Sequence, residues 1–131
     1  MFNKVGTVCV FVADQDRAKN FYVNTLGFAL VTDQPLFPGA ANRWVSVVPR
    51  AGGETELILY LPDENWEHYK QVVGKSQSVT LDVSDIVTLV NNLKAKGVQV
   101  TREPDPQPWG TNAMILDSEG NTILLVETPK R

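Results

Sequence analysis

The sequence carries one structural pattern twice, and this repeat limits the possible folds more than any other feature. In each copy the predicted order of elements is strand, helix, strand, loop, strand, turn and strand. Three ordered matches of this kind indicate an internal duplication whose second copy has slightly shorter connections. The matched segments, at offsets of 71, 70 and 67 residues, are 7–14 with 78–85, 26–28 with 96–98, and 53–62 with 120–129.

Each copy begins with an apolar strand that leads into a capped helix. Val5–Val12 is rich in β-branched and aromatic residues, which is typical of a buried strand. Asp14 can cap the helix that follows, and Gly27 can end it. In the second copy, Ser84 or Asp85 takes the capping position. These signals place one helix between the first two strands of each copy.

Two loops rich in proline and glycine occupy equivalent places in the two copies. Residues 34–42 form the first loop, which contains Phe37, and residues 103–110 form the second, which contains Trp109. We therefore divide the chain into module one at about 4–62, a helical linker at about 63–76, and module two at about 77–129. A length of 131 residues suits a single compact domain built from both modules.

Composition argues against several classes of partner. The net charge is −3, from 12 basic and 15 acidic residues, so we expect neither nucleic acid nor a membrane surface as a partner. No apolar run reaches the length that spans a membrane. Cys9 is the only cysteine, so an internal disulfide is impossible. We expect a soluble cytoplasmic protein.

The chain resembles the vicinal oxygen chelate superfamily, which includes glyoxalase I, extradiol dioxygenases, fosfomycin-resistance enzymes and bleomycin-binding proteins. The resemblance covers nearly the whole chain. It implies an α+β fold in which two tandem βαβββ modules form a half-open, eight-stranded barrel around a cavity. It also implies a homodimer, for which exposed sheet edges give a physical motive. The residues that carry it are Val12-Ala13-Asp14, Ala18, Phe21-Tyr22 and Leu26-Gly27-Phe28 in module one, and Trp109-Gly110, 116–121 and 123–127 in module two.

The resemblance also locates the positions that hold metal in the metal-dependent members. Those positions lie on the first and last strands of each module, and they map to Thr7, Ser78, Leu57 and Leu124. Two hydroxyl groups and two leucines offer no charge and almost no coordination to a divalent ion. We therefore expect no metal and no other cofactor.

Strand register is the step on which this mapping depends, because a shift of one residue exchanges the two faces of a strand. A slipped last strand would turn Glu56 inward in module one, opposite Ile123 in module two, and Glu127 would face the same way near the end of its strand. The only histidine, His68, lies outside the strands on the connection between modules. We interpret His68 as a solvated helix residue and not as a metal ligand.

Alternation along the strands and a set of aromatic residues define the candidate cavity. Side chains two residues apart share a face, so Cys9 and Phe11 follow Thr7 toward the cavity. Aromatic side chains provide flat apolar walls for planar ligands. The candidate ligand-binding residues are Thr7, Cys9, Phe11, Phe37, Trp44, Leu57, Leu59, Ser78, Thr80, Asp82, Trp109 and Leu124.

Each candidate also has a structural interpretation. Cys9 has no sequence feature that marks a catalytic thiol, and a small buried hydrophobic residue fits it as well. Phe11 can pack under the first helix, and Asp82 can bond the backbone near a helix cap. Some of the aromatic residues can serve the core or a dimer interface.

Three functions remain open. The first is a metal-free protein of the glyoxalase and bleomycin-resistance type, which binds a small apolar or planar molecule in its cavity. The second is an enzyme of the lyase, isomerase or dioxygenase type with a rearranged or metal-free site, in which Asp82 or Glu56 would act as acid and base. An accessory protein without a small ligand is a third, because this fold carries many chemistries. The sequence does not identify a ligand.

Overall fold

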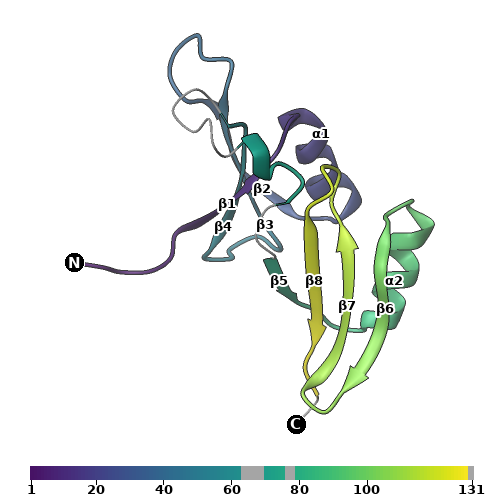
Figure 1. Ribbon diagram of the computed structural model, residues 1–131. Coiled ribbons are helices and arrows are strands. Elements are labelled where there is room, and N and C mark those ends of the chain that lie inside the picture. Colours follow the sequence, from purple (N-terminus) through teal and green to yellow (C-terminus); the bar gives the residue numbers. More distant parts are fainter. Residues whose placement is uncertain (63–69, 76–78, 130–131) are drawn as a thin grey trace.

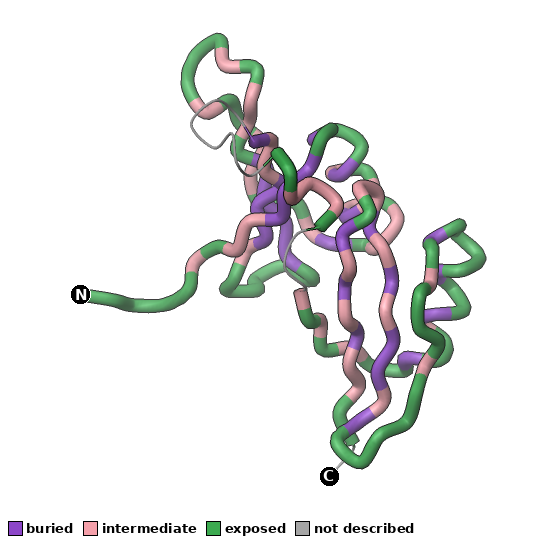
Figure 2. The backbone as a smooth tube through the Cα atoms, in the orientation of Figure 1, coloured by how far each residue is buried: buried purple, intermediate pink, exposed green. Residues whose placement is uncertain are grey.

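The computed structural model describes residues 1–62, 70–75 and 79–129, and Figure 1 shows two modules of similar design. Module one contains β1 (Thr7–Phe11), α1 (Gln15–Asn20), the π-helical turn η1 (Phe21–Thr25), β2 (Ala29–Pro35), β3 (Arg43–Val48) and β4 (Glu56–Tyr60). Module two contains β5 (Val79–Asp82), α2 (Ile86–Ala95), β6 (Val100–Gln107), β7 (Gly110–Leu116) and β8 (Thr122–Glu127). Residues 1–5 extend away from the first sheet and are exposed (Figures 1 and 2).

The sheet topology confirms the internal repeat. The two four-stranded sheets have the orders β1-β4-β3-β2 and β5-β8-β7-β6, so the second repeats the first. In each sheet the first and last strands of the module are parallel, and the other neighbours are antiparallel. Among the described strands no ladder joins the two sheets. The predicted α+β class with two βαβββ modules in an open barrel is therefore confirmed.

The helices begin where the capping residues predict. The side chain of Asp14 accepts a hydrogen bond of 3.0 Å from the backbone N–H of Arg17, which satisfies one of the free donors of α1. Gly27 has φ +82° and ends the helical segment in the left-handed region that suits glycine. Asp85 precedes α2 with φ +54° and makes no side-chain cap. No helix of the described residues is long and apolar enough to cross a membrane.

One hydrophobic core contains side chains from both modules. It combines strand residues of the two sheets with Ala18 and Tyr22 from the first helical segment and Ile86, Val90 and Leu93 from α2. Burying these side chains removes apolar surface from water, which is the main favourable contribution to folding. The modules therefore share a core and do not fold around separate ones.

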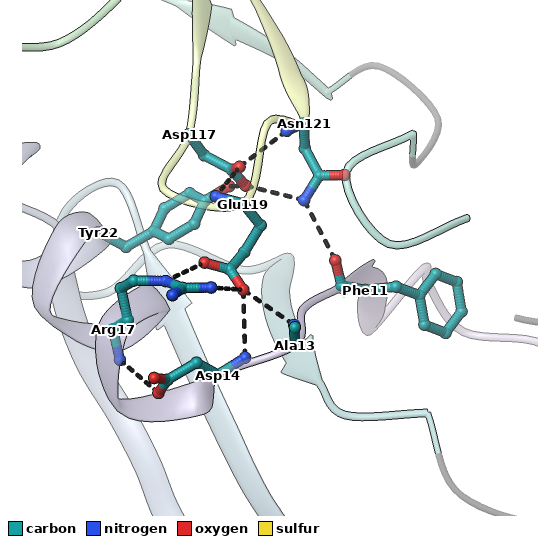
Figure 3. Close-up of polar contacts among 8 residues, drawn as sticks. All are labelled: Phe11, Ala13, Asp14, Arg17, Tyr22, Asp117, Glu119 and Asn121. Carbon is teal, nitrogen blue, oxygen red and sulfur yellow. Dashed lines mark hydrogen bonds and ion pairs between the residues drawn. The ribbon is translucent and has the colours of Figure 1, made fainter. Parts of the chain in front are cut away.

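A turn of module two binds the first helix of module one, as Figure 3 shows. The hydroxyl of Tyr22 donates to Asp117 Oδ2 at 2.8 Å, although Tyr22 is only 1% exposed. Asn121 Nδ2 donates both to Asp117 Oδ2 and to the backbone oxygen of Phe11. Burial and the neighbouring Asp117 carboxylate raise the pKa of Tyr22, so it stays a neutral donor at physiological pH.

Glu119 forms the second part of this contact. Its carboxylate accepts from Arg17 Nε at 2.8 Å and from the backbone N–H groups of Ala13 and Asp14 at 2.9 and 3.1 Å. The Glu119 side chain is 1% exposed. Burial pushes the pKa of Glu119 upward, but these hydrogen bonds outweigh it and hold the pKa below its usual value.

One predicted loop is wrong. Residues 103–110 were expected as a loop, but β6 continues through Pro104 and Pro106 to Gln107, and only a tight turn at 108–109 connects it to β7. Proline is compatible with β6 because this strand lies at the edge of its sheet and donates fewer ladder hydrogen bonds. Two shifts of register between β6 and β7 accompany the irregular strand.

Candidate functional site

Each sheet has a core face, which packs into the shared core, and an outer face, which points away from it. On β1, Val10 belongs to the core and Val8 packs against it. Alternation then puts Thr7, Cys9 and Phe11 on the outer face, as the sequence predicts. We keep the names core face and outer face for both sheets.

Parallel pairing brings residues of β4 beside this outer face. The pairs are Thr7 with Glu56, Cys9 with Ile58, and Phe11 with Tyr60. The rings of Phe11 and Tyr60 are 6.3 Å apart in an edge-to-face arrangement. Trp44 lies two residues from Ser46 on β3 and therefore shares the outer face, and we call Phe11, Tyr60 and Trp44 the aromatic row. Trp44 at the end of this row is 38% exposed.

The middle of the same outer face is more tightly packed. Cys9, Ile58, Ser46 and Thr32 form a second row by their pairing. Ile58 and Ser46 are fully buried, and the hydroxyl of Ser46 has no hydrogen-bond partner within the described part of the chain. Burial raises the pKa of the Cys9 thiol, so the reactive thiolate is scarce at neutral pH.

Two predicted cavity residues lie on the wrong face. Leu57 and Leu59 pair with Val8 and Val10, and both belong to the hydrophobic core. They were expected beside Thr7, but β4 presents Glu56 there instead. The correction comes from register, because a displacement of one residue exchanges the faces of a strand.

The pairing also corrects the repeat offset for the last strands. Leu57 pairs with Val8 in module one, and the equivalent pair in module two is Ile123 with Val79. The structural offset is therefore 66 residues (from 57 to 123) and not 67. Leu124 consequently corresponds to Ile58, and it lies on the outer face as predicted.

The outer face of module two is more accessible than that of module one. Figure 2 shows how buried and half-buried residues alternate along β7 and β8. The half-buried residues Leu124, Met114 and Val126 form its apolar centre, and Thr80 and Asp82 on β5 are exposed at one side. Strand pairing arranges these residues in two neighbouring rows that run across the sheet from β5 to β6. The first row is Thr80, Leu124, Met114 and Arg102, and the second is Asp82, Val126, Asn112 and Asp105. The predicted candidate Ser78 lies outside the described residues.

The two loop aromatics do not meet in one chain. Phe37 is 64% exposed in the β2–β3 loop, and Trp109 is 55% exposed in the β6–β7 turn. Figure 1 places this loop and this turn at opposite ends of the molecule. His68, the residue interpreted as solvated, also lies outside the described residues.

A separate apolar cavity of about 360 Å³ lies where the two modules meet. Its walls include the core-face residues Val8 and Leu57 of module one and Val79 and Leu81 of module two. Leu57 and Thr80 are the predicted candidates that line it. Its described walls carry no charged side chain and are mostly apolar, so an apolar group suits this cavity best.

The donors on the outer faces do not fit a catalytic metal centre. Within the described residues, no group of three His, Cys, Asp or Glu side chains could hold a metal ion. Glu56 beside Thr7 is one carboxylate next to one hydroxyl, and Leu124 offers no donor atom. Catalytic divalent sites commonly use three protein ligands of nitrogen, oxygen or sulfur.

Several outer-face residues were missing from the sequence prediction. Ile58 and Met114 belong to this surface by strand pairing. Arg102 on β6 was missed because the strand was expected to end just before it, and Asn112 lies on β7, a strand that the sequence did predict. Knowing the register of each strand would have identified these residues. Glu56 was considered only in the alternative in which the last strand of module one is shifted by one residue.

Comparisons with known proteins agree with this architecture. The model of the Glyoxalase/Bleomycin resistance protein/Dioxygenase superfamily matches residues 4–125. The uncharacterized protein YetH of Bacillus subtilis is 35% identical over 127 residues, which cover 97% of this chain and 100% of YetH. The crystal structure of TnmS3, an antibiotic binding protein from Streptomyces sp. CB03234, is 34% identical with a TM-score of 0.82, covering 98% of both chains. A probable lactoylglutathione lyase of Synechocystis is 28% identical and covers 92% of both chains.

Proposed function

The chain belongs to the Glyoxalase/Bleomycin resistance protein/Dioxygenase superfamily, and from this membership we propose that it binds small planar or apolar molecules without changing them chemically. The observation that carries the proposal is the aromatic row of Phe11, Tyr60 and Trp44 on the outer face of module one. Aromatic side chains gathered on one face supply apolar surface against which a planar ligand can pack. Similarity to an antibiotic binding protein across 98% of both chains supports the same class of function.

We also propose that two copies complete one binding site. The core faces of both sheets pack into one core, so both outer faces point away from it. The outer face of module two is the more accessible one, and a ligand on it is covered on one side only by its own chain. In a two-fold dimer, module one of each chain can face module two of its partner, which encloses two equivalent sites. This arrangement would also bring Phe37 and Trp109 of different chains toward one cavity.

Binding of a neutral planar probe tests this function. N-phenyl-1-naphthylamine becomes more fluorescent in an apolar site, and its titration gives a dissociation constant. We expect saturable binding that Trp44→Ala weakens about tenfold, since loss of a stacking ring removes more than 1 kcal/mol. Val87→Ala is the matched control, because Val87 is an exposed apolar residue on α2 of module two, whereas the aromatic row lies on the sheet of module one.

Two outcomes would count against the proposal. The first is the absence of saturable binding for this probe and for a panel of planar antibiotics and metabolites at high micromolar concentration. The second is an equal effect of the Trp44 and Val87 substitutions. Light scattering coupled to size-exclusion chromatography tests the dimer separately, and a monomer at binding concentrations would contradict the shared site.

An enzyme is the second candidate function. Glu56 lies beside Thr7 on the outer face of module one, and Asp82 is exposed on that of module two, so each carboxylate is placed to contact a ligand. The similarity to a probable lactoylglutathione lyase favours this alternative. Elemental analysis of protein purified without chelator tests the metal-dependent form of this candidate. Stoichiometric nickel, zinc, iron or manganese would favour the enzyme.

A further inference from the structure

The outer face of module two carries a cation that the fold holds in place. Arg102 Nη1 donates to Asn112 Oδ1 at 3.1 Å, and Asn112 is only 2% exposed. Asn112 is itself fixed, since its Nδ2 donates to the backbone oxygen of Asp105 at 3.2 Å. A buried amide therefore orients a guanidinium that is otherwise at the surface.

The direction of Arg102 follows from its hydrogen bond. Asn112 pairs with Val126, which pairs with Asp82 on β5. Leu81, the neighbour of Asp82 on β5, packs against the core, so this row lies on the outer face. The guanidinium reaches the side chain of Asn112, and it therefore lies on the outer face too.

The guanidinium keeps most of its donors available. It has five N–H groups, and Asn112 is the only partner that the structure gives it among the described residues. No described carboxylate forms an ion pair with Arg102. Of its nearby acids, Glu103 is paired with a cation, since Lys94 Nζ donates to it at 2.7 Å, whereas Asp105 accepts from the neutral amide of Gln107 at 3.0 Å and keeps its charge.

The remaining acid on this face is too distant to neutralise Arg102. Asp82 lies on β5 and Arg102 on β6, at opposite edges of the sheet. Three strand spacings separate them, which is about 14 Å. Salt screens exposed charges beyond about 8 Å at physiological ionic strength.

An apolar surface lies between these two charges. Met114 pairs with Arg102, and Leu124 pairs with Met114, so two half-buried apolar side chains continue the row of Arg102 across the outer face. An apolar floor with an oriented cation at its edge matches a ligand that has an apolar ring and an oxyanion. Arginine suits carboxylate, sulfonate and phosphate oxygens because its planar fork can donate two parallel hydrogen bonds.

We propose that Arg102 selects apolar ring molecules that carry an anionic group, and that it does so by binding the oxyanion. This inference rests on the proposed binding function, and it names the ligand class for the module-two half of the site. Asn112 is a positioning residue, because it acts only through Arg102.

Two fluorescent probes with the same ring skeleton test the proposal. They are 8-anilino-1-naphthalenesulfonate, which carries a sulfonate, and N-phenyl-1-naphthylamine, which lacks it. We expect the sulfonate to bind wild type about tenfold more tightly, as for one charge-assisted hydrogen-bonded contact. Arg102→Gln should remove that difference and leave the affinity for the neutral probe unchanged. Arg102→Lys should retain part of it, because charge remains while the fork is lost.

Arg50→Gln is the matched control, because Arg50 is an exposed cation in the β3–β4 turn of the other module. It should leave both affinities unchanged, and melting curves of all variants confirm that they fold. Equal sulfonate affinity in wild type and Arg102→Gln would overturn the inference while the proposed function stands. Failure of both probes to bind wild type would contradict the proposed function and the inference together.

Discussion

Removing the Tyr22 hydroxyl from the contact between the modules should lower the free energy of unfolding by about the value of one buried hydrogen bond. Tyr22→Phe deletes the donor to Asp117 Oδ2 at 2.8 Å and leaves the ring in place. The ring keeps its edge contacts with Phe21 and Phe28, so no cavity forms. Asp117 retains hydrogen bonds from the backbone N–H groups of Glu119 and Asn121.

The expected loss is about 2 kcal/mol, because a buried hydrogen bond to a charged group contributes about 1.5–3 kcal/mol. For a chain of this size, that corresponds to a fall in Tm of roughly 6–10 °C. Urea unfolding followed by circular dichroism measures the free energy of unfolding. The m value should stay the same, since the surface exposed on unfolding does not change.

A double-mutant cycle isolates the interaction. Asp117→Asn is made alone and together with Tyr22→Phe, and the two changes should be non-additive by about 1 kcal/mol or more. If Tyr22→Phe changes the free energy of unfolding by less than about 0.3 kcal/mol, or if the two effects simply add, the hydrogen bond does not couple the modules and the reasoning fails.

Four further changes test other parts of the structure. Glu119→Gln should destabilise the protein at neutral pH. Because folding lowers the pKa of Glu119, the difference in unfolding free energy from wild type should persist above about pH 5 and vanish as pH falls through the folded pKa. A difference that does not depend on pH would contradict the ionic contact. Ser46→Ala should raise the free energy of unfolding by about 1 kcal/mol, since it removes a buried hydroxyl without a described partner, and a loss of stability would reveal a partner. Leu57→Ala should cost about 2–5 kcal/mol in urea unfolding with unchanged probe affinity in the folded protein, and weaker binding would restore Leu57 to the ligand site. Gly110→Ala should lower the Tm, because φ is +144° and a Cβ atom would lie 2.7 Å from the backbone oxygen of Glu127; a neutral result would show that the turn can shift.

The duplicated pattern was sufficient to predict the fold class. The order of strands and helices along the chain and the Asp14 cap follow from local signals, whereas the order of strands within each sheet appears only in the structure. Agreement between hydrophobic pattern, capping residue and turn residue at each position makes such signals dependable.

Register could not be predicted in the last strand of module one. Leu57, Ile58 and Leu59 are consecutive apolar residues, and all three are buried, so no polar residue marks the face that points outward. A period of two carries information only when the two faces differ in polarity. β4 pairs with β1, which lies almost fifty residues earlier in the sequence, and this pairing determines which of the three side chains point toward the core.

Arg102 escaped prediction for a different reason. Pro104 and Pro106 follow it closely, and prolines normally indicate a loop. The strand persists because it lies at the sheet edge, where bulges accommodate the prolines. The hydrogen bond from Arg102 to the buried Asn112 becomes visible only once β6 and β7 are paired in the structure.

Methyl NMR during titration with a planar ligand tests the central claim most directly, because neighbouring residues of β8 report on opposite faces. Leu124 and Val126 belong to the outer face, whereas Ile123 and Leu125 belong to the core. With anthraquinone-2-sulfonate as the ligand, we predict intermolecular NOEs to the methyl groups of Leu124 and Val126 and none to those of Ile123 and Leu125. NOEs to the core-face methyl groups alone, or no NOEs at saturating ligand, would contradict binding on the outer faces.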